Sequence, residues 1–163
     1  MYIEGPVFVV SKDNTTVGCY RTVDRAERTL TRKVGDGLQL DSVLVFDGLA
    51  RPVEARQLGD AVKLAISHLV VDPWQVRARA QEAISHKLNE FAAQGDPVVT
   101  PAGEFPKDVV MERLGALRSS AGYDKSFHEF ALRLVTDLDP FDPDDPADPY
   151  KIKICRWLCW CCD

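Results

Sequence analysis

Residues 6–33 read PVFVVSKDNTTVGCYRTVDRAERTLTRK, and this stretch decides the fold class. Its apolar, β-branched opening from Pro6 to Ser11 predicts a strand, and after a polar turn the residues Thr16 to Arg21 predict the strand that pairs with it. Thr22 is a residue type that caps helices, and the apolar side chains between Val23 and Lys33 recur at helical spacing. The chain is therefore expected to begin with the order β-β-α.

Three further strands are predicted after this unit. Ser42 to Asp47 and Ala50 to Leu58 are separated by an Asp-Gly turn, and Gly59-Asp60 predicts a tight hairpin turn into Ala61 to Ile66. The last of these segments also fits the start of a helix. As a strand, it completes the order β-β-α-β-β-β, which predicts an α+β fold with a small, mostly antiparallel sheet of about five strands.

A helix signal follows at Asp72-Pro73-Trp74-Gln75. Aspartate is a favoured N-cap, proline is favoured at the first helical position, and the glutamine lies three residues beyond the cap. The helix is predicted from Pro73 to about Ala93. Its apolar stripe comprises Val76, Ala80, Ala83, Ile84, Leu88 and Phe91. The side chains expected on its solvent side are Arg77, Arg79, Glu82, Lys87 and Glu90.

The rest of the folded part is predicted to be helical after a loop. Asp96 to Glu104 contains proline and glycine and predicts that loop, and Pro106 then begins a helix. A capping box at Ser126–Glu129 and apolar residues at helical spacing predict a third helix that ends at Leu138. Residues 1–138 are therefore expected to form a single α+β domain that ends in three helices.

Residues 139–149 form an acidic segment in which Asp-Pro recurs every three residues. Because polyproline II has about 3 residues per turn and rises about 3.1 Å per residue, the paired aspartates are expected along one edge, on the order of 9 Å apart. This spacing is too wide for two of them to chelate one calcium ion. The segment is predicted to be a stiff, solvated spacer, or an acidic rod that a basic groove recognises.

The terminal peptide, residues 150–163, reads YKIKICRWLCWCCD and holds four of the five cysteines of the chain. As a strand, it would place its tyrosine and both isoleucines on one face. As a helix, it would place Cys155, Cys159 and Cys162 on one face. The spacing of the residues leaves both conformations open.

One function that fits this peptide is a protein contact. Residues 1–138 would bind another protein and present the tail to it, as in an adaptor, an inhibitor or an immunity-type protein. Tryptophan anchors dominate the binding energy of many interfaces, and basic side chains help to orient a partner. The expected partner-binding residues are Trp157, Leu158, Trp160, Lys151, Lys153 and Arg156.

In the alternative, the cysteines carry chemistry. Thiolates are ligands for Zn²⁺ and Cu(I), although the paired Cys-x-x-Cys spacing of zinc sites is missing. The tail could also be the cleaved or modified end of a precursor peptide, with residues 1–138 as the recognition leader. A third possibility is reversible membrane attachment, because cysteines near basic residues can be palmitoylated. The residues concerned are Cys155, Cys159, Cys161 and Cys162.

Composition narrows the class of partner. The net charge of −5 is concentrated in the acidic segment, so that residues 1–136 are nearly neutral. A nearly neutral domain is not expected to have the extensive basic surface that binds nucleic acid. The sequence shows no secretory signal and no transmembrane segment, so a cytoplasmic location with reduced thiols is expected.

The sequence contains no recognisable catalytic motif. A phosphate-binding glycine loop, His-Glu-x-x-His and Gly-x-Ser-x-Gly are all missing. His68, His86 and His128 are scattered along the chain, and a nucleophile–base pair of Cys19 and His128 has no support from the spacing. We therefore expect a non-catalytic protein that needs no cofactor.

Overall fold

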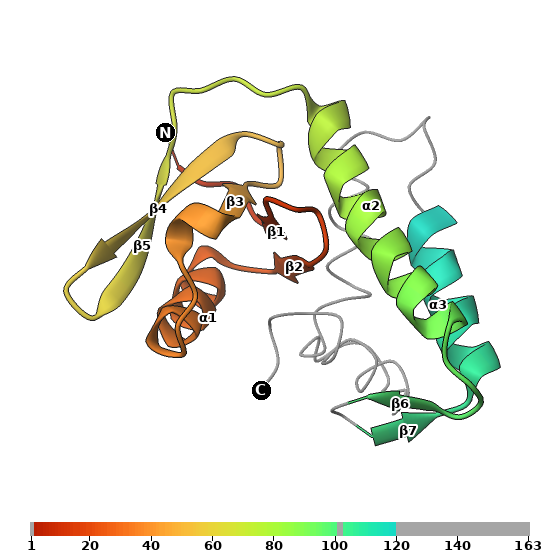
Figure 1. Cartoon of the computed structure of the whole chain (residues 1–163). Coiled ribbons are helices and arrows are strands. Elements are labelled where there is room, and N and C mark those ends of the chain that lie inside the picture. Colours follow the sequence, from red (N-terminus) through yellow and green to blue (C-terminus); the bar gives the residue numbers. More distant parts are fainter. Residues whose placement is uncertain (1, 101–102, 120–163) are drawn as a thin grey trace.

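The computed structural model describes residues 2–100 and 103–119 (Figure 1). Its elements in chain order are β1 (Val7–Ser11), β2 (Val17–Tyr20), α1 (Val23–Gly35), the 3-10 turn η1 (Leu40–Ser42), β3 (Val43–Phe46), β4 (Pro52–Leu58), β5 (Ala61–Ile66), α2 (Pro73–Ala92), β6 (Val98–Thr100), β7 (Gly103–Phe105) and α3 (Lys107–Ser119). The predicted α+β class and the order β-β-α-β-β-β are confirmed.

The first five strands form one antiparallel sheet in the order β2-β1-β3-β4-β5. Within it, Phe8 of β1 pairs with Cys19 of β2 and with Phe46 of β3, and all three side chains are buried. Helix α1 packs against β5 and β2, whereas α2 runs past β1 and β2 (Figure 1). Every residue of β1 is buried, as expected of a strand that is covered on both faces.

The β4–β5 hairpin forms the outer part of the sheet. Gly59 has a φ of +62° at the turn, a left-handed conformation that glycine adopts without steric cost. The pairing of Leu58 with Ala61 leaves Gly59 and Asp60 as a two-residue turn, as the sequence predicts. Ala61–Ile66 is therefore a strand and not the start of a helix.

Helix α1 protects the free edge of β5. The Thr31 hydroxyl accepts a hydrogen bond from the backbone N–H of Val62 at 2.8 Å, and the Glu27 carboxylate accepts one from the N–H of Leu64 at 3.0 Å. The same carboxylate binds the ammonium group of Lys63 at 2.7 Å. Backbone donors at an edge strand would otherwise be available to pair with another chain.

Helix α2 begins as predicted, because the Asp72 carboxylate accepts a hydrogen bond from the backbone N–H of Trp74 at 3.0 Å. The whole predicted apolar stripe is buried. The expectation that Arg77 lies on the solvent side is wrong: its exposed fraction is 3 %. At 3.6 residues per turn, Arg77 falls between Ile84 and Leu88 on the buried face. Its guanidinium lies over the ring of Trp74, 4.8 Å from the centroid, a contact that suits a desolvated cation.

The prediction of a loop from Asp96 to Glu104 is also wrong, because the short strands β6 and β7 pair there. Val98 and Phe105 oppose each other in this pair and are both buried, so the two strands bring apolar side chains into the core. Helix α3 then packs against α2. Lys107 joins the two by donating hydrogen bonds to the carbonyls of Ala92 and Gln94 at 2.9 and 2.6 Å.

Several predicted segments lie outside the described residues. They are the third helix at 126–138, the acidic segment at 139–149 and the terminal peptide at 150–163. The division of the chain into a domain, a spacer and a terminal peptide therefore stays a prediction.

Candidate functional site

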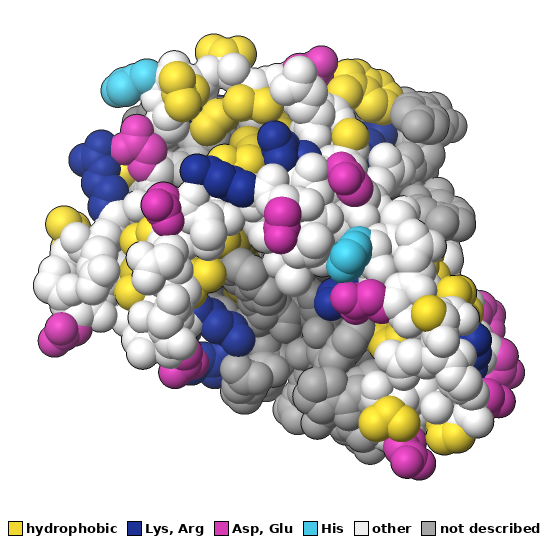
Figure 2. All heavy atoms as spheres, viewed as in Figure 1, with side chains coloured by type: hydrophobic (Ala, Val, Ile, Leu, Met, Phe, Trp, Pro, Cys, Tyr) yellow, Lys and Arg dark blue, Asp and Glu magenta, His cyan; other side chains and the backbone are white. Residues whose placement is uncertain are grey.

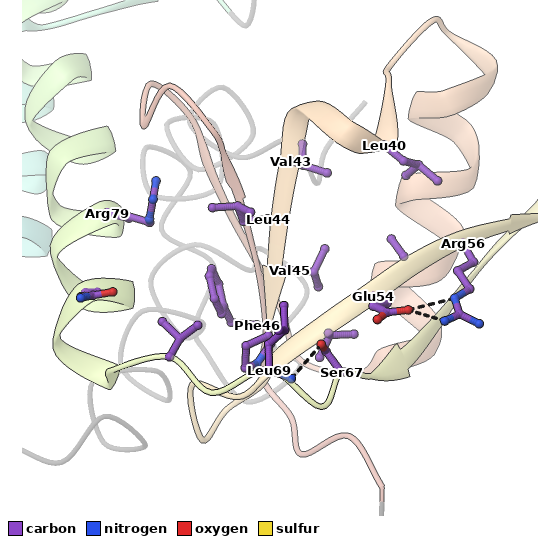
Figure 3. Close-up of a pocket in the computed structure, with 15 residues that line it drawn as sticks. Leu40, Val43, Leu44, Val45, Phe46, Glu54, Arg56, Ser67, Leu69 and Arg79 are labelled. Carbon is purple, nitrogen blue, oxygen red and sulfur yellow. Dashed lines mark hydrogen bonds and ion pairs between the residues drawn. The ribbon is translucent and has the colours of Figure 1, made fainter.

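A groove with a volume of about 470 Å³ lies between the sheet and α2 (Figure 3). Strands β3 and β4 supply a largely apolar floor, Leu69 and Val71 come from the connection that precedes α2, and Arg79 comes from α2 itself. The volume is within the range of about 300 to 1,000 Å³ that is typical of ligand pockets. The groove is thus the candidate binding site among the described residues.

The side chains of Glu54, Arg56, Ser67 and Arg79 in the groove are bonded to neighbouring protein groups. Arg56 donates from Nε to the Glu54 carboxylate at 3.0 Å, and Arg79 donates to the Asn14 side-chain oxygen at 2.8 Å. The Ser67 hydroxyl accepts a hydrogen bond from the backbone N–H of Leu69 at 3.2 Å. None of these bonds joins a nucleophile to a base. A ligand in the groove would therefore make mainly apolar contacts, with two arginines nearby.

Large apolar side chains are exposed beside this groove. Leu69 and Val70 are 72 % and 95 % exposed, and Trp74, in the first turn of α2, is 48 % exposed. Figure 2 shows hydrophobic side chains gathered over one end of the visible face. We call Leu69, Val70 and Trp74 the apolar ridge. A ridge of this kind next to a groove marks a contact surface more often than a single exposed leucine does.

Asp47 is a fully buried carboxylate, and its contacts show a structural role. One oxygen accepts hydrogen bonds from the backbone N–H groups of Leu49 and Arg51 at 3.0 and 2.9 Å. The other accepts from the N–H of Glu4 at 3.2 Å and from Nε of Arg51 at 2.8 Å. This hydrogen bond raises the pKa of Arg51. The carboxylate therefore joins the β3–β4 turn to the N-terminal segment.

The structure describes only one member of the Cys19–His128 pair, so that pair is not tested. Cys19 is buried in β2, whereas His68 is exposed in the connection before α2. His86 lies 3.2 Å from the carboxylate of Glu90, one turn later in the same helix. In residues 2–100 and 103–119, no group of three or more histidine, cysteine, aspartate or glutamate side chains is placed to hold a metal ion. His128 lies outside this part of the chain.

The tail candidates also lie outside the described residues, so the structure does not place them. They are the contact residues Trp157, Leu158, Trp160, Lys151, Lys153 and Arg156, and the alternative metal or modification residues Cys155, Cys159, Cys161 and Cys162.

The apolar ridge was missed in the sequence. The available signal was the run Leu69-Val70-Val71 between a strand and a helix cap, where polar loop residues are usual.

Comparisons of the chain with protein-family models, with curated proteins and with solved structures find no match. Within the described segments, no helix combines the length and the apolar character that crossing a bilayer requires.

Proposed function

We propose that this protein is a non-catalytic protein-binding protein of the adaptor, inhibitor or immunity type. The observation that carries the proposal is the apolar ridge beside the groove, because Leu69, Val70 and Trp74 leave large apolar surfaces in water. Burying one such side chain contributes about 1.5 to 3 kcal/mol, and tryptophan is enriched among residues that dominate binding energy. The ridge thus has the composition of an interface centre.

The groove also indicates the chemistry of the partner. Its floor is apolar and its lining includes the cations Arg56 and Arg79 and the anion Glu54. The fitting occupant is therefore a segment of another protein that inserts an aliphatic or aromatic side chain and carries a carboxylate nearby. The carboxylate would be attracted to Arg79 and Arg56, which orients the segment without supplying most of the affinity.

The terminal peptide is the second proposed contact. Trp157, Leu158 and Trp160 would act as anchors, and Lys151, Lys153 and Arg156 would set the orientation. A partner that engages both the ridge and the tail would gain effective concentration from the linkage between them.

The test of the ridge uses two matched valines. A photo-reactive amino acid at Val70 identifies the protein that contacts the ridge, and the affinity of that protein is then measured for Val70→Asp and for Val99→Asp. Val99 is 62 % exposed in β6, so both variants place a carboxylate on the surface. We expect Val70→Asp to weaken binding about tenfold or more and Val99→Asp to leave it unchanged. Equal affinities for the two variants would contradict the proposal.

Two further variants of the full chain separate the roles of the tail. Replacing Trp157 and Trp160 by alanine should weaken binding of the same partner, whereas replacing the four tail cysteines by serine should not. The opposite result, with a metal, lipid or cleavage visible in the intact mass of the wild type and lost in the cysteine variant, would assign the tail to metal binding or modification.

A further inference from the structure

One edge of β4 is open over part of its length. On its outer side, β4 pairs with β5 from Val53 to Leu58. On its inner side, the pairing with β3 stops at Val45–Val53. Figure 3 shows the two strands diverging beyond this point, and residues of both line the groove. From Glu54 to Leu58, the inner edge of β4 is therefore not paired with any of the described strands.

The register of the hairpin determines which backbone groups of β4 face this open edge. Leu58 closes the two-residue turn in a hydrogen-bonded pair, and every second residue before it bonds to β5 in the same way. The alternate residues, Ala55 and Gln57, direct their N–H and C=O groups to the opposite side, towards the groove. Arg51 belongs to the same alternate set, and its carbonyl accepts a hydrogen bond on the β3 side, from the N–H of Asp47 at 2.9 Å.

The two edges of the hairpin are treated differently by the fold. At the edge of β5, side chains of α1 accept hydrogen bonds from the N–H groups of Val62 and Leu64. In residues 2–100 and 103–119, no side chain closes the inner edge of β4 at Ala55 and Gln57 in this way. Ala55 is partly exposed and Gln57 is exposed. Open N–H and C=O groups at the edge of a sheet form a template for the addition of a strand.

The side chains around the open edge indicate the sequence pattern of the added strand. Val43 and Val45 of β3 share a face with Ala55, because opposed residues and every second residue along a strand lie on the same face. Arg56 lies on the other face. The groove lining contains two arginines and one glutamate, so positive charge is in excess there. A complementary strand therefore alternates apolar residues on the first face with a carboxylate opposite Arg56.

We propose that an extended segment of a partner protein binds the open edge of β4 as an added antiparallel strand. Apolar residues would lie opposite Ala55 and Gln57 and exchange backbone hydrogen bonds with them, and an acidic residue would lie opposite Arg56. A second copy of β4 fits less well, because bonding through both Ala55 and Gln57 would place the two Arg56 side chains directly opposite each other. The inference rests on the proposed protein-binding function and specifies how the segment in the groove is held.

The probe is the acetylated and amidated peptide Thr-Val-Asp-Val-Thr, which has this alternation. It is titrated into the isotope-labelled full chain, and the backbone amide resonances are followed by NMR. We expect saturable downfield shifts of the amide protons of Ala55 and Gln57, because both N–H groups gain an acceptor. Smaller shifts are expected for Glu54 and Arg56, whose N–H groups already bond to β5. The absence of saturable shifts at Ala55 and Gln57 would overturn the proposal.

Two matched pairs of variants test whether the contact is made by the backbone. Gln57→Pro removes an N–H that faces the open edge and costs no hydrogen bond to β5, whereas Gln57→Thr keeps that N–H. We expect Gln57→Pro to weaken peptide binding several-fold and Gln57→Thr to retain it, with unfolding midpoints as the check on folding. In the peptide, N-methylation of a valine removes an N–H that faces β4, and N-methylation of the aspartate removes one that faces away. Equal binding of the two methylated peptides would overturn the proposal even if Gln57→Pro does not fold.

The outcomes separate this inference from the proposed function. If the peptide does not bind, but the partner found through Val70 still depends on that residue, the protein contact stands and the added strand is rejected. If the amide resonances of Ala55 and Gln57 shift with protein concentration in the absence of peptide, a second copy occupies the edge, and this result would also overturn the proposal.

Discussion

At the scale of single residues, two buried charges decide local geometry in different ways. Asp47 is buried in a turn where backbone N–H groups and Arg51 satisfy both of its oxygens. Arg77 is buried in α2 and stacks on Trp74. A buried charge is tolerated only where hydrogen bonds or polarisable partners replace water, and both residues meet that condition.

The substitution Asp47→Asn tests the role of the buried carboxylate. The asparagine amide would place N–H donors against the donors of Arg51 and Glu4, and it would leave the Arg51 guanidinium without its anion. We expect a loss of about 3 kcal/mol or more in the free energy of unfolding, measured by urea denaturation. The exposed Asp41 provides a control, because Asp41→Asn should change this free energy by less than about 0.5 kcal/mol. A similarly small effect of Asp47→Asn would refute the structural role.

At the scale of elements, α1 and β5 are joined by side-chain acceptors and not by another strand. Thr31 and Glu27 take the backbone donors of Val62 and Leu64. This arrangement closes the free edge of β5 by a contact between residues more than thirty positions apart in the chain. It also explains why the hairpin remains paired although β4 is largely exposed towards its turn.

Removing the Glu27 carboxylate should therefore weaken the fold and expose the edge of β5. We expect Glu27→Ala to lower the free energy of unfolding by about 1 to 3 kcal/mol, because the N–H of Leu64 loses its acceptor. Self-association should rise as well, measured by light scattering at increasing protein concentration. The control is Glu90→Ala, which removes a carboxylate that pairs with Lys87 on the surface of α2. If Glu90→Ala and Glu27→Ala are equally stable and equally monomeric, the edge contact has no such function.

At the scale of the whole molecule, the described residues contain a buried core that includes all of β1 and one face of α2. The outer edge of the sheet at β5 is closed by α1. The candidate contact surface is the apolar ridge beside the groove, formed by the connection before α2 and the first turn of that helix.

This organisation predicts the effect of removing residues 139–163. If residues 1–138 form the complete domain, the unfolding midpoint of the shortened chain, measured by calorimetry, should lie within about 2 °C of that of the full chain. A loss of about 1 kcal/mol would shift this midpoint by about 2 to 8 °C. A drop of several degrees that persists at high salt would instead indicate that Tyr150–Ile154 adds a strand to the sheet. A drop that high salt removes would instead indicate that the charges of residues 139–163 contribute to stability.

The sequence by itself determined the class of the fold, the strand and helix order up to α2, and the buried stripe of that helix. These features depend on local periodicity, on caps such as Asp72 and on turn residues such as Gly59, all of which act between near neighbours. Tertiary structure alone decided the strand order, the burial of Arg77, the pairing of β6 with β7 and the position of the apolar ridge beside the groove. Each of these depends on which surfaces meet across long stretches of chain, and residue spacing carries no information about that.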